Sequence, residues 1–474
     1  MKAWQMEKEL MEKAIPKLLT EEEQGWSAIE PLEKAEDARI KLWWYSEVPG
    51  SGAPERLIIA AIQSMENKGF QVEEAEALIQ PGLKAFQEDD MASLHRISGQ
   101  IFHLLNQAPV NEASPYWKYA AYTSWDQLKQ AANFPASVSF DVTQASFQDQ
   151  LYAGWLAQII GGAIGTAMEG YTTHQLKKAF GKVDGYVRKP NTFNDDITYE
   201  LAFLKAFESK GFQISAADIA DQWLALVPFG WSAEDIALRN LKLGIYPPES
   251  GTLHNPFSDW IGAQMRGAVC GMVAPGNAEE AARLAWLDGS ISHANNGILG
   301  EVFNAVLTAR AFVTTHMPSL VEEVVAMMPK DAEYTSVVNF ALEQCRKTNQ
   351  WETAWRACEE KYEAYNWIHA YPNAAAQVVA LWFGHNDFNE TMNIIALAGQ
   401  DVDCNAAQIA TMLGIARGVE SIDAKWRDPI GDQLDTYLRG MKQMTISGLA
   451  RWTAAVAQKA AIGAIHESPG KATS

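Results

Sequence analysis

Two short segments each place a pair of aspartates where an apolar helix is expected to begin. The segment "NDDITYELAFLKA" has Asp195 and Asp196 directly after Asn194, and "AGQDVDCNAAQIATMLGI" has Asp401 and Asp403 two residues apart. One Asn or Asp is enough to cap a helix by accepting a hydrogen bond from a free amide group. Two neighbouring carboxylates repel each other unless a cation balances them. Each pair is therefore open to two interpretations, a helix cap or a metal site.

The repetition of the pair favours the metal site. Carboxylate and amide oxygens suit Mg²⁺, Mn²⁺ or Ca²⁺ rather than Zn²⁺. Two adjacent divalent ions would orient substrate hydroxyl groups and activate a water molecule. The sequence has no H-E-x-x-H motif, no Glu-x-x-His pair, no P-loop and no G-x-S-x-G motif, which disfavours the chemistries that use them. A structural helical protein whose aspartates are only caps remains the alternative.

A third segment, "AQIIGGAIGTAMEG", places small residues and one glutamate on a single helix face. Ala157, Gly161, Gly165 and Glu169 are spaced by four, so they follow one another along that face. Small side chains let a second backbone approach closely, and Glu169 would then project a carboxylate into the contact. The other interpretation is ordinary helix packing with Glu169 at a solvated end.

The spacing of apolar residues indicates which elements position these groups. Strand-like alternation is convincing only in "ASVSFDVT", around 137–143. Elsewhere apolar residues recur every three or four positions, which predicts an all-α fold in bundle-like layers. The clearest predicted helices cover 55–69, 300–316, 373–385 and 405–418.

A change in composition predicts a domain boundary near residue 135. Residues 1–134 are rich in Glu and Lys in amphipathic patterns, which predicts an N-terminal helical domain without candidate chemistry. Its histidines, His95 and His103, follow an amphipathic helix pattern and are assigned to surface or packing. Residues 135–474 carry Gly, Ala and Asn among apolar helices, together with all the segments described above, and are predicted to form the catalytic domain.

The composition excludes several classes of partner. The chain of 474 residues is 48% hydrophobic and 20% charged, with a formal charge of −20. This is sufficient for a large core, and the negative charge disfavours nucleic acids and anionic membrane surfaces while suiting bound cations. No signal peptide or membrane span is expected. Four scattered cysteines without a C-x-x-C pair indicate a cytoplasmic, reduced protein: Cys270, Cys345, Cys358 and Cys404.

Taken in order, these segments resemble the ADP-ribosylglycohydrolase family. The matching segments are "GGAIGTAMEGY", "NDDITYELAFLKA", "SISHANNGILGEVFNAVLTARAF" and "AGQDVDCNAAQIATMLGI", and the likeness covers about residues 150–418. Intervening segments such as "HAYPNAAAQVVALWFGHNDFNETM" are similar to a bacterial branch with a D-x-D-C-N signature. The resemblance implies an all-α fold around a binuclear Mg²⁺ or Mn²⁺ site at the bottom of a cleft, with no organic cofactor.

Carried over by position, the resemblance implies a role for each of several residues. Glu169 and Asp196 would be catalytic, with Glu169 as the base or proton shuttle. Trp231 and Arg266 come from a stretch that could wall the pocket, where the Arg could meet a phosphate. The implied metal ligands are Asn194, Asp195, Asp196, Asp401, Asp403 and Cys404. The implied substrate-binding or second-layer residues are Gly165, Asn255, Gln264, His293, His369 and Asn405, together with Asn373.

Three positions depart from the family's usual pattern. Asn194 stands where members usually have Thr or Asp, which would replace a ligand oxygen by an uncharged amide carbonyl. Cys404 stands where many members have Thr or Ser, and Gly161-Gly162 replaces a common Gly-Asp pair. These changes leave open whether one of the two metals binds.

The expected reaction is hydrolysis of an N- or O-glycosidic bond of an ADP-ribosyl or ribosyl-type substrate, either a small molecule or a protein-linked glycoside. Water would attack an oxocarbenium-like centre while the metals hold the sugar hydroxyls. One alternative is a hydrolase of nucleosides or other small glycosides, because the motifs concern the sugar and not its leaving group. Another is a non-catalytic binding protein with a degenerate metal site, which Asn194 favours.

Overall fold

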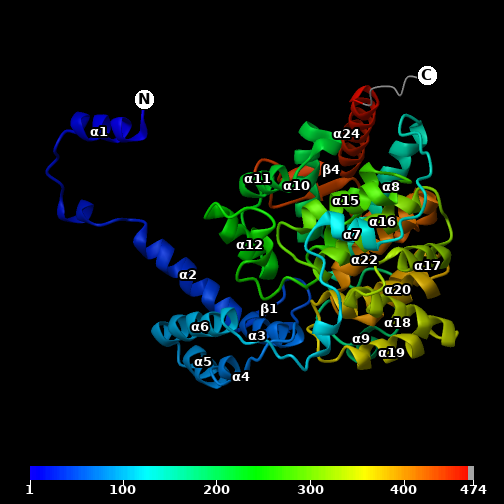
Figure 1. Ribbon diagram of the computed structural model, residues 1–474, viewed down its shortest axis with the longest axis horizontal. Helices are drawn as coiled ribbons and strands as arrows, with labels where there is room; N and C mark the ends of the chain where they lie inside the picture. Colours follow the sequence, from blue (N-terminus) through cyan, green and yellow to red (C-terminus); the bar gives the residue numbers. More distant parts are fainter. Residues whose placement is uncertain (468–474) are drawn as a thin grey trace.

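Helices form nearly all the regular structure of this protein (Figure 1). The computed structural model describes residues 1–467. The prediction of an all-α fold is confirmed. Within the described residues, strands occur only as two antiparallel pairs: β1 (Ser46–Glu47) with β2 (Pro54–Glu55), and β3 (Gln433–Asp435) with β4 (Gln443–Thr445).

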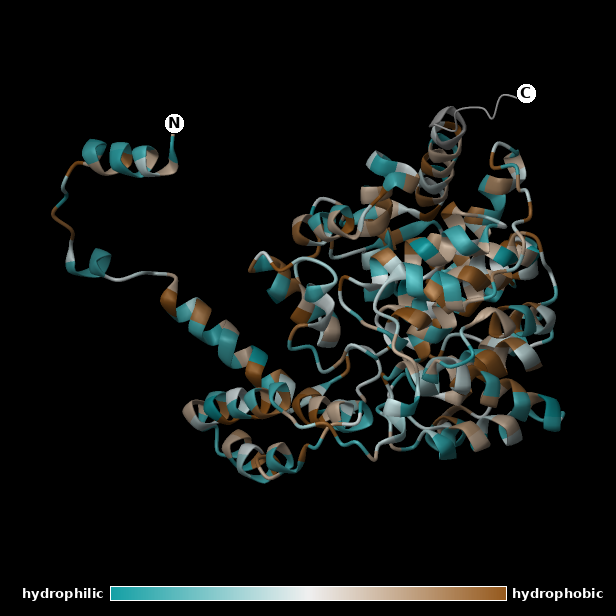
Figure 2. Ribbon diagram, viewed as in Figure 1, coloured by the Kyte–Doolittle hydropathy of each residue, from teal (hydrophilic) through white to brown (hydrophobic). Residues whose placement is uncertain are grey.

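The first 134 residues contain short amphipathic helices. In Figure 1, α1 and the chain that leads to α2 extend away from the rest of the molecule, and no residue of α1 is buried. Figure 2 shows that α1 is largely hydrophilic. The helices are α1 (Ala3–Lys13), α2 (Ile29–Trp44), α3 (Leu57–Asn67), α4 (Glu73–Glu76), α5 (Ile79–Gln87), α6 (Met91–Asn106) and α7 (Trp125–Ala131).

The helices after residue 143 pack in layers around two buried helices that contact each other, α8 and α22. Every residue of α22 from Val402 to Ile415 is buried, as is every residue of the adjoining α16. Helices that are apolar on all sides belong in the interior of a large domain. The first group is α8 (Ala145–Gly165), α9 (Thr173–Phe180), α10 (Asp195–Lys210), α11 (Ala216–Leu226), α12 (Ser232–Lys242), α13 (Glu249–Thr252), α14 (Ala268–Val273), α15 (Ala278–Gly289) and α16 (Asn296–Ala311). The second is α17 (Met317–Met327), α18 (Glu333–Lys347), α19 (Trp351–Lys361), α20 (Ala370–Phe383), α21 (Phe388–Ala398), α22 (Val402–Arg417), α23 (Ala424–Ile430) and α24 (Ile446–Glu467).

Local predictions succeeded where helical spacing was clear and failed at the one predicted strand. The four predicted helices correspond to α3, α16, α20 and α22. Residues 137–143 are not a strand. Residues 142–143 belong to a turn, and Val138 N donates to Gly276 O at 3.0 Å in another turn. The segment therefore has no partner strand with which to form a ladder. No helix within residues 1–467 is both long and apolar enough to cross a membrane.

The helices before residue 106 dock on the later part of the chain through buried polar contacts. The Lys68 ammonium is buried and donates to Asn255 O at 3.3 Å and to Ser258 Oγ at 3.1 Å. Ser64 Oγ donates to Pro256 O at 2.7 Å. Buried polar groups need such partners, so this part of the N-terminal region is joined to the body. The boundary near residue 135 stays a prediction.

One buried carboxyl group in α10 predicts a dependence of stability on pH. Glu200 lies between Gln158 and Gln408 in the core, and burial raises its pKa from 4.5 to about 8. The folded state therefore favours the neutral carboxyl group. This preference contributes fully to the free energy of unfolding below about pH 4.5, and the contribution is lost as the pH rises through 8. Between pH 5.5 and 8, we expect the free energy of unfolding of the wild type to fall by on the order of 3 kcal/mol relative to Glu200→Gln.

Urea denaturation at several pH values measures this difference. Glu74→Gln, at an exposed position of α4, is the matched control and should keep the wild-type profile. Parallel pH profiles for the wild type and Glu200→Gln would contradict the prediction.

Candidate metal centre

The first aspartate pair is not needed as a helix cap, because Asn194 caps α10. Asn194 Oδ1 accepts a hydrogen bond from Asp196 N at 2.6 Å. Its amide nitrogen donates to Asp403 Oδ2 at 3.4 Å. Asn194 therefore closes the end of one helix and joins it to the carboxylate of the other. Its role as a metal ligand stays a prediction, since the cap uses one lone pair of the amide oxygen.

Only one member of the second pair serves the start of its helix, because Asp403 Oδ1 accepts a hydrogen bond from Cys404 N at 3.0 Å in the first turn of α22. Asp401 is at the N-cap position of α22, but its side chain accepts no capping hydrogen bond. Its backbone N–H donates to Asn373 Oδ1 at 3.0 Å, which fixes the turn. Asp196 Oδ2 and Asp401 Oδ1 are buried without a hydrogen-bond partner. Buried carboxylate oxygens without donors are costly, and a cation would satisfy both.

The electrostatics of the cluster also fit a bound cation. Burial, followed by the charge of Asp403, raises the pKa of Asp196 and Asp401 well above their usual value. The side chain of Asp195 is open to the pocket but surrounded by protein, and this desolvation together with Asp403 raises its pKa to about 6. Carboxyl groups with such pKa values are poorly stabilised as anions by the protein alone. A divalent ion would supply the missing positive charge.

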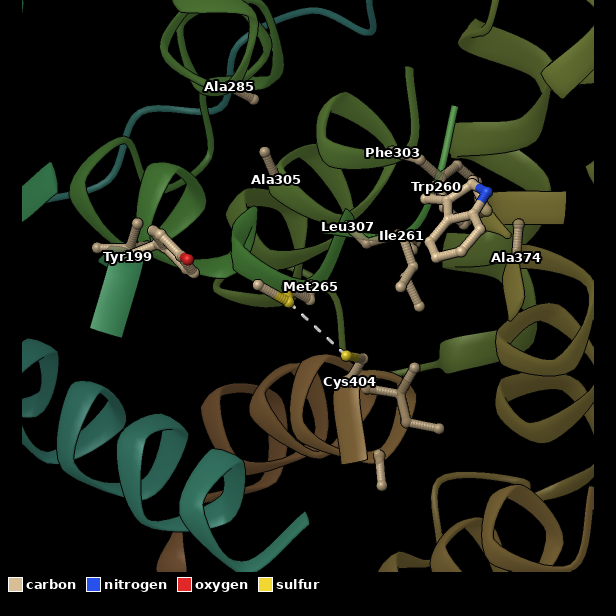
Figure 3. Close-up of a cluster of buried hydrophobic side chains, with 14 of the residues drawn as sticks. Tyr199, Trp260, Ile261, Met265, Ala285, Phe303, Ala305, Leu307, Ala374 and Cys404 are labelled. Atoms are coloured by element: carbon tan, nitrogen blue, oxygen red, sulfur yellow. Dashed lines mark hydrogen bonds between the residues drawn. The ribbon is translucent and has the colours of Figure 1, made fainter. Parts of the chain in front are cut away.

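Cys404 lies at the centre of this cluster. Its Sγ is 3.3 Å from Asp196 Oδ1 and 3.7 Å from Met265 Sδ (Figure 3). Burial and the neighbouring carboxylates raise the pKa of the thiol, so in this geometry Cys404 donates a hydrogen bond to Asp196. One ligand atom from each of Asp401, Asp403 and Cys404 lies within 4.8 Å of the others. These residues therefore suit a divalent cation that is bound by oxygen ligands, with the thiol next to the cation.

Glu169 reaches the same place from the turn that follows α8. Its backbone N–H donates to Gly165 O at 3.0 Å, and the turn ends at Gly170, whose φ is +78°. Glu169 is buried, and burial, then Asp403 and Asp401, raise its pKa well above 4.5. A hydrogen bond to Asp403 has the same effect. Without a bound cation, the surroundings of Glu169 therefore favour the protonated form of its carboxyl group.

The close contact of the glycines of α8 with α22 positions the carboxyl groups of Glu169 and Asp403 relative to each other. A side chain at Gly161 would overlap Ala406 O, and one at Gly165 would overlap the backbone N and Cα of Asp403. The two backbones are in direct contact here, which places the start of α22 beside the end of α8. Gly165 therefore has a packing role and does not line the pocket.

Replacing Gly165 with alanine should disturb Asp403 directly. We expect a loss of about 1–3 kcal/mol in the free energy of unfolding, because overpacking forces the backbones apart, together with weaker Mn²⁺ binding. The control is Gly99→Ala, since a side chain at this exposed position of α6 meets no atom within 4 Å. This control should gain up to about 1 kcal/mol. Equal urea midpoints for the two variants would contradict the close contact.

The carboxylate cluster forms the base of a pocket of about 580 Å³. Asp195, Asp401, Asp403, Cys404 and Glu169 all line it. Aromatic and aliphatic side chains form other parts of the lining, which is usual for a small-molecule site. The aromatic wall residues are Phe193, Phe229, Trp231, Trp367 and Tyr437.

The predicted substrate-binding residues lie outside this pocket. His369 caps α20 by accepting from Tyr371 N at 3.2 Å. Asn255 donates to three backbone carbonyls. Gln264 accepts from Tyr334 Oη at 2.9 Å. Their polar atoms are used in holding the helices together, so the structure does not bring them to the substrate space.

The remaining predicted residues are likewise framework groups. Asn405 exchanges hydrogen bonds with Asn373 and Gln377. His293 Nδ1 is 2.8 Å from Ser292 Oγ. Arg266 is buried, with Nε 2.5 Å from Asp288 Oδ2 and Nη1 3.1 Å from Glu234 Oε1. Its charge is neutralised inside the protein, which corrects the expectation that it meets a phosphate.

Comparison with known proteins identifies a family profile that covers most of the chain after residue 142. The ADP-ribosylglycohydrolase family profile matches residues 143–461, about two thirds of the chain. No protein of curated function matches. Among 41 matching chains of solved structures is an "ADP-ribosylglycohydrolase-related protein complex", with 18% identity, a TM-score of 0.49, and coverage of 67% of this chain and 98% of the other. The extent of the profile match establishes the relationship, and this chain belongs to the ADP-ribosylglycohydrolase family.

Proposed function

We propose that this protein hydrolyses a glycosidic bond at a ribose-type sugar with the help of Mg²⁺ or Mn²⁺. The proposal rests on one observation above all, that Asp195 of α10 lines one pocket together with Asp401, Asp403 and Glu169. Asp195, Asp196, Asp401 and Asp403 would hold the metal, which family membership also favours. When bound, the metal would orient the sugar hydroxyls and activate water.

The protein's own side chains supply the proton transfers in this proposal. The protonated carboxyl of Glu169 is placed to donate to a leaving group in the pocket. Asp196 Oδ1 accepts from the Cys404 thiol, which leaves Oδ2 free to bind a cation or to accept a proton from water. The buried base of the pocket limits access of other water molecules. We also propose residues 135–474 as the catalytic domain.

A two-part experiment tests the proposal. Calorimetric titration with Mn²⁺ and Mg²⁺ should show binding by the wild type and none by Asp195→Ala. A screen of ADP-ribosyl-arginine, ADP-ribosyl-serine and nucleosides should then show metal-dependent release of a free sugar from at least one of them. Absence of metal binding would overturn the proposal. Metal binding without release of sugar from any glycoside would favour the alternative of a binding protein.

A further inference from the structure

The N-terminal region supplies one wall of the pocket. The hairpin of β1 and β2 pairs Ser46 with Glu55 and Glu47 with Pro54. It precedes the residues that the family profile matches by almost ninety positions. The pocket-lining residues from this region are Leu42, Ser46, Glu47, Val48, Pro49 and Glu55.

Specific contacts fix the hairpin to the turn that carries Glu169. A side chain at Gly170 would come within 2.5 Å of Ala53 Cβ, so the two segments touch. Tyr171 Oη donates to Ser51 O at 3.1 Å. The Arg188 guanidinium donates to Gly50 O at 2.5 Å and to Thr166 O at 3.3 Å. The hairpin is therefore a fixed part of the pocket and lies beside the proposed proton donor.

Glu55 is the buried carboxyl group that the hairpin contributes to the pocket lining. Its side chain is buried, with an exposed fraction of 7%. The Trp231 indole N–H donates to its two oxygens at 3.1 and 3.2 Å, and Ser46 Oγ donates to Oε2 at 3.1 Å. A carboxylate has about four acceptor positions, so these two donors orient Glu55 without filling its capacity.

Two aromatic rings line the pocket together with Glu55. The rings of Phe229 and Trp231 lie 6.2 Å apart with an interplanar angle of 33°. Aromatic faces attract flat π-systems and cations, and a buried carboxylate beside them accepts hydrogen bonds from N–H groups.

The charge of the pocket disfavours phosphate. No Lys, Arg or His from residues 1–467 lines it, and the Arg188 guanidinium is directed to backbone carbonyls. Helix α12 starts at the pocket, but Glu234 and Asp235 in its first turn oppose an anion there. Proteins that recognise phosphate use Arg, Lys or an open helix N-terminus. The seven carboxylates of the lining are Glu47, Glu55, Glu169, Asp195, Glu234, Asp401 and Asp403.

We propose, on the basis of the proposed function, that the pocket accepts a phosphate-free glycoside with a flat leaving group whose N–H donors bind Glu55 against Trp231 and Phe229. Such a group is either an amino-substituted heteroaromatic base or a guanidinium. Glu55 is then a specificity-determining residue contributed from outside the part of the chain that the family profile matches.

Equilibrium titration of the Mg²⁺-loaded protein tests this assignment. The probes are adenosine and a ribosyl-guanidine, which distinguish the two kinds of leaving group, and AMP and ADP-ribose, which carry phosphate. Affinity is read as Kd, or as KM where free sugar appears. We expect adenosine or the ribosyl-guanidine to bind at least ten times more tightly than either AMP or ADP-ribose.

Two variants test the role of Glu55. Glu55→Gln keeps the shape of the side chain and should weaken binding of the preferred probe by about 10- to 100-fold, the usual effect of a charge-assisted hydrogen bond. Its Mg²⁺ affinity should equal that of the wild type. Glu66→Gln removes the same charge from an exposed position of α3 outside the pocket lining and should leave probe binding unchanged.

The outcomes separate this inference from the proposed function. Equal or tighter binding of AMP or ADP-ribose, or equal effects of the two variants, would overturn the inference while metal binding and sugar release could still stand. Failure of both phosphate-free probes to bind a protein that binds Mg²⁺ would also overturn it. Failure of Mg²⁺ binding would remove the proposed function and this inference together.

Discussion

Asp403→Asn should stabilise the metal-free protein and abolish its thermal response to Mn²⁺. The charge of Asp403 contributes to the raised pKa of Asp195, Asp196, Asp401 and Glu169. It is therefore the largest common source of repulsion within the cluster. Asparagine has nearly the same shape but no charge, so without metal the variant loses repulsion and keeps its packing.

With metal present, the same substitution should have the opposite effect. A ligand at one hundred times its dissociation constant stabilises the folded state by about 2.7 kcal/mol, which for a large domain corresponds to a rise in Tm of roughly 4 °C. The wild type should show this rise, and Asp403→Asn should show none because its site lacks a carboxylate. Sugar release by the variant should fall to background, since the metal orients the substrate.

Differential scanning fluorimetry with and without Mn²⁺ measures both effects, and Asp387→Asn is the matched control. Asp387 is a true helix cap, because its carboxylate accepts from Glu390 N at 2.7 Å at the start of α21. Asparagine caps a helix about as well as aspartate, so this control should follow the wild type with and without metal. If Asp403→Asn instead lowers the metal-free Tm and leaves the Mn²⁺ response intact, Asp403 is a structural residue.

The part of the site that follows from local spacing could be predicted from the sequence. The starts of α10 and α22 and the four-residue glycine spacing are short-range patterns, and each is read within one or two helical turns. The direct contact of Gly165 with Asp403 is the physical consequence of that spacing. What the spacing leaves open is which residue is the cap. The hydrogen bond from Asp196 N to Asn194 decides it.

The walls of the pocket depend on contacts between distant residues and could not be predicted in this way. Glu55 meets Trp231 across a sequence separation of 176 residues, and β1 and β2 have only two residues each. The only local signal was the turn-rich segment "EVPGSGAPE", which resembles an ordinary loop. Conversely, His293 and His369 have the residue type of a site, but neither lines the pocket and each uses its Nδ1 in the framework.

Glu169→Gln should distinguish a proton donor from a residue that only shapes the site. Its carboxyl group is buried beside Asp401 and Asp403, and its pKa is raised well above the ordinary value. A carboxyl group that stays protonated near neutral pH can protonate a departing oxygen or nitrogen. Glutamine keeps the size and the hydrogen bonds of this group but carries no transferable proton.

The rate of sugar release should therefore depend on the leaving group. For a substrate whose leaving group needs a proton, we expect Glu169→Gln to lower kcat by about 10²–10⁴-fold. For a nitrophenyl riboside, whose leaving group departs as a stable anion, the same substitution should change kcat by less than about tenfold. Mn²⁺ affinity, measured by calorimetry, should equal that of the wild type, because a neutral carboxyl group is replaced by a neutral amide and no assigned ligand is lost. An equal loss of rate with both substrates would show that Glu169 positions water or metal and does not protonate the leaving group. The difference between the two substrates is specific to proton donation, because misfolding or loss of metal would slow both reactions alike.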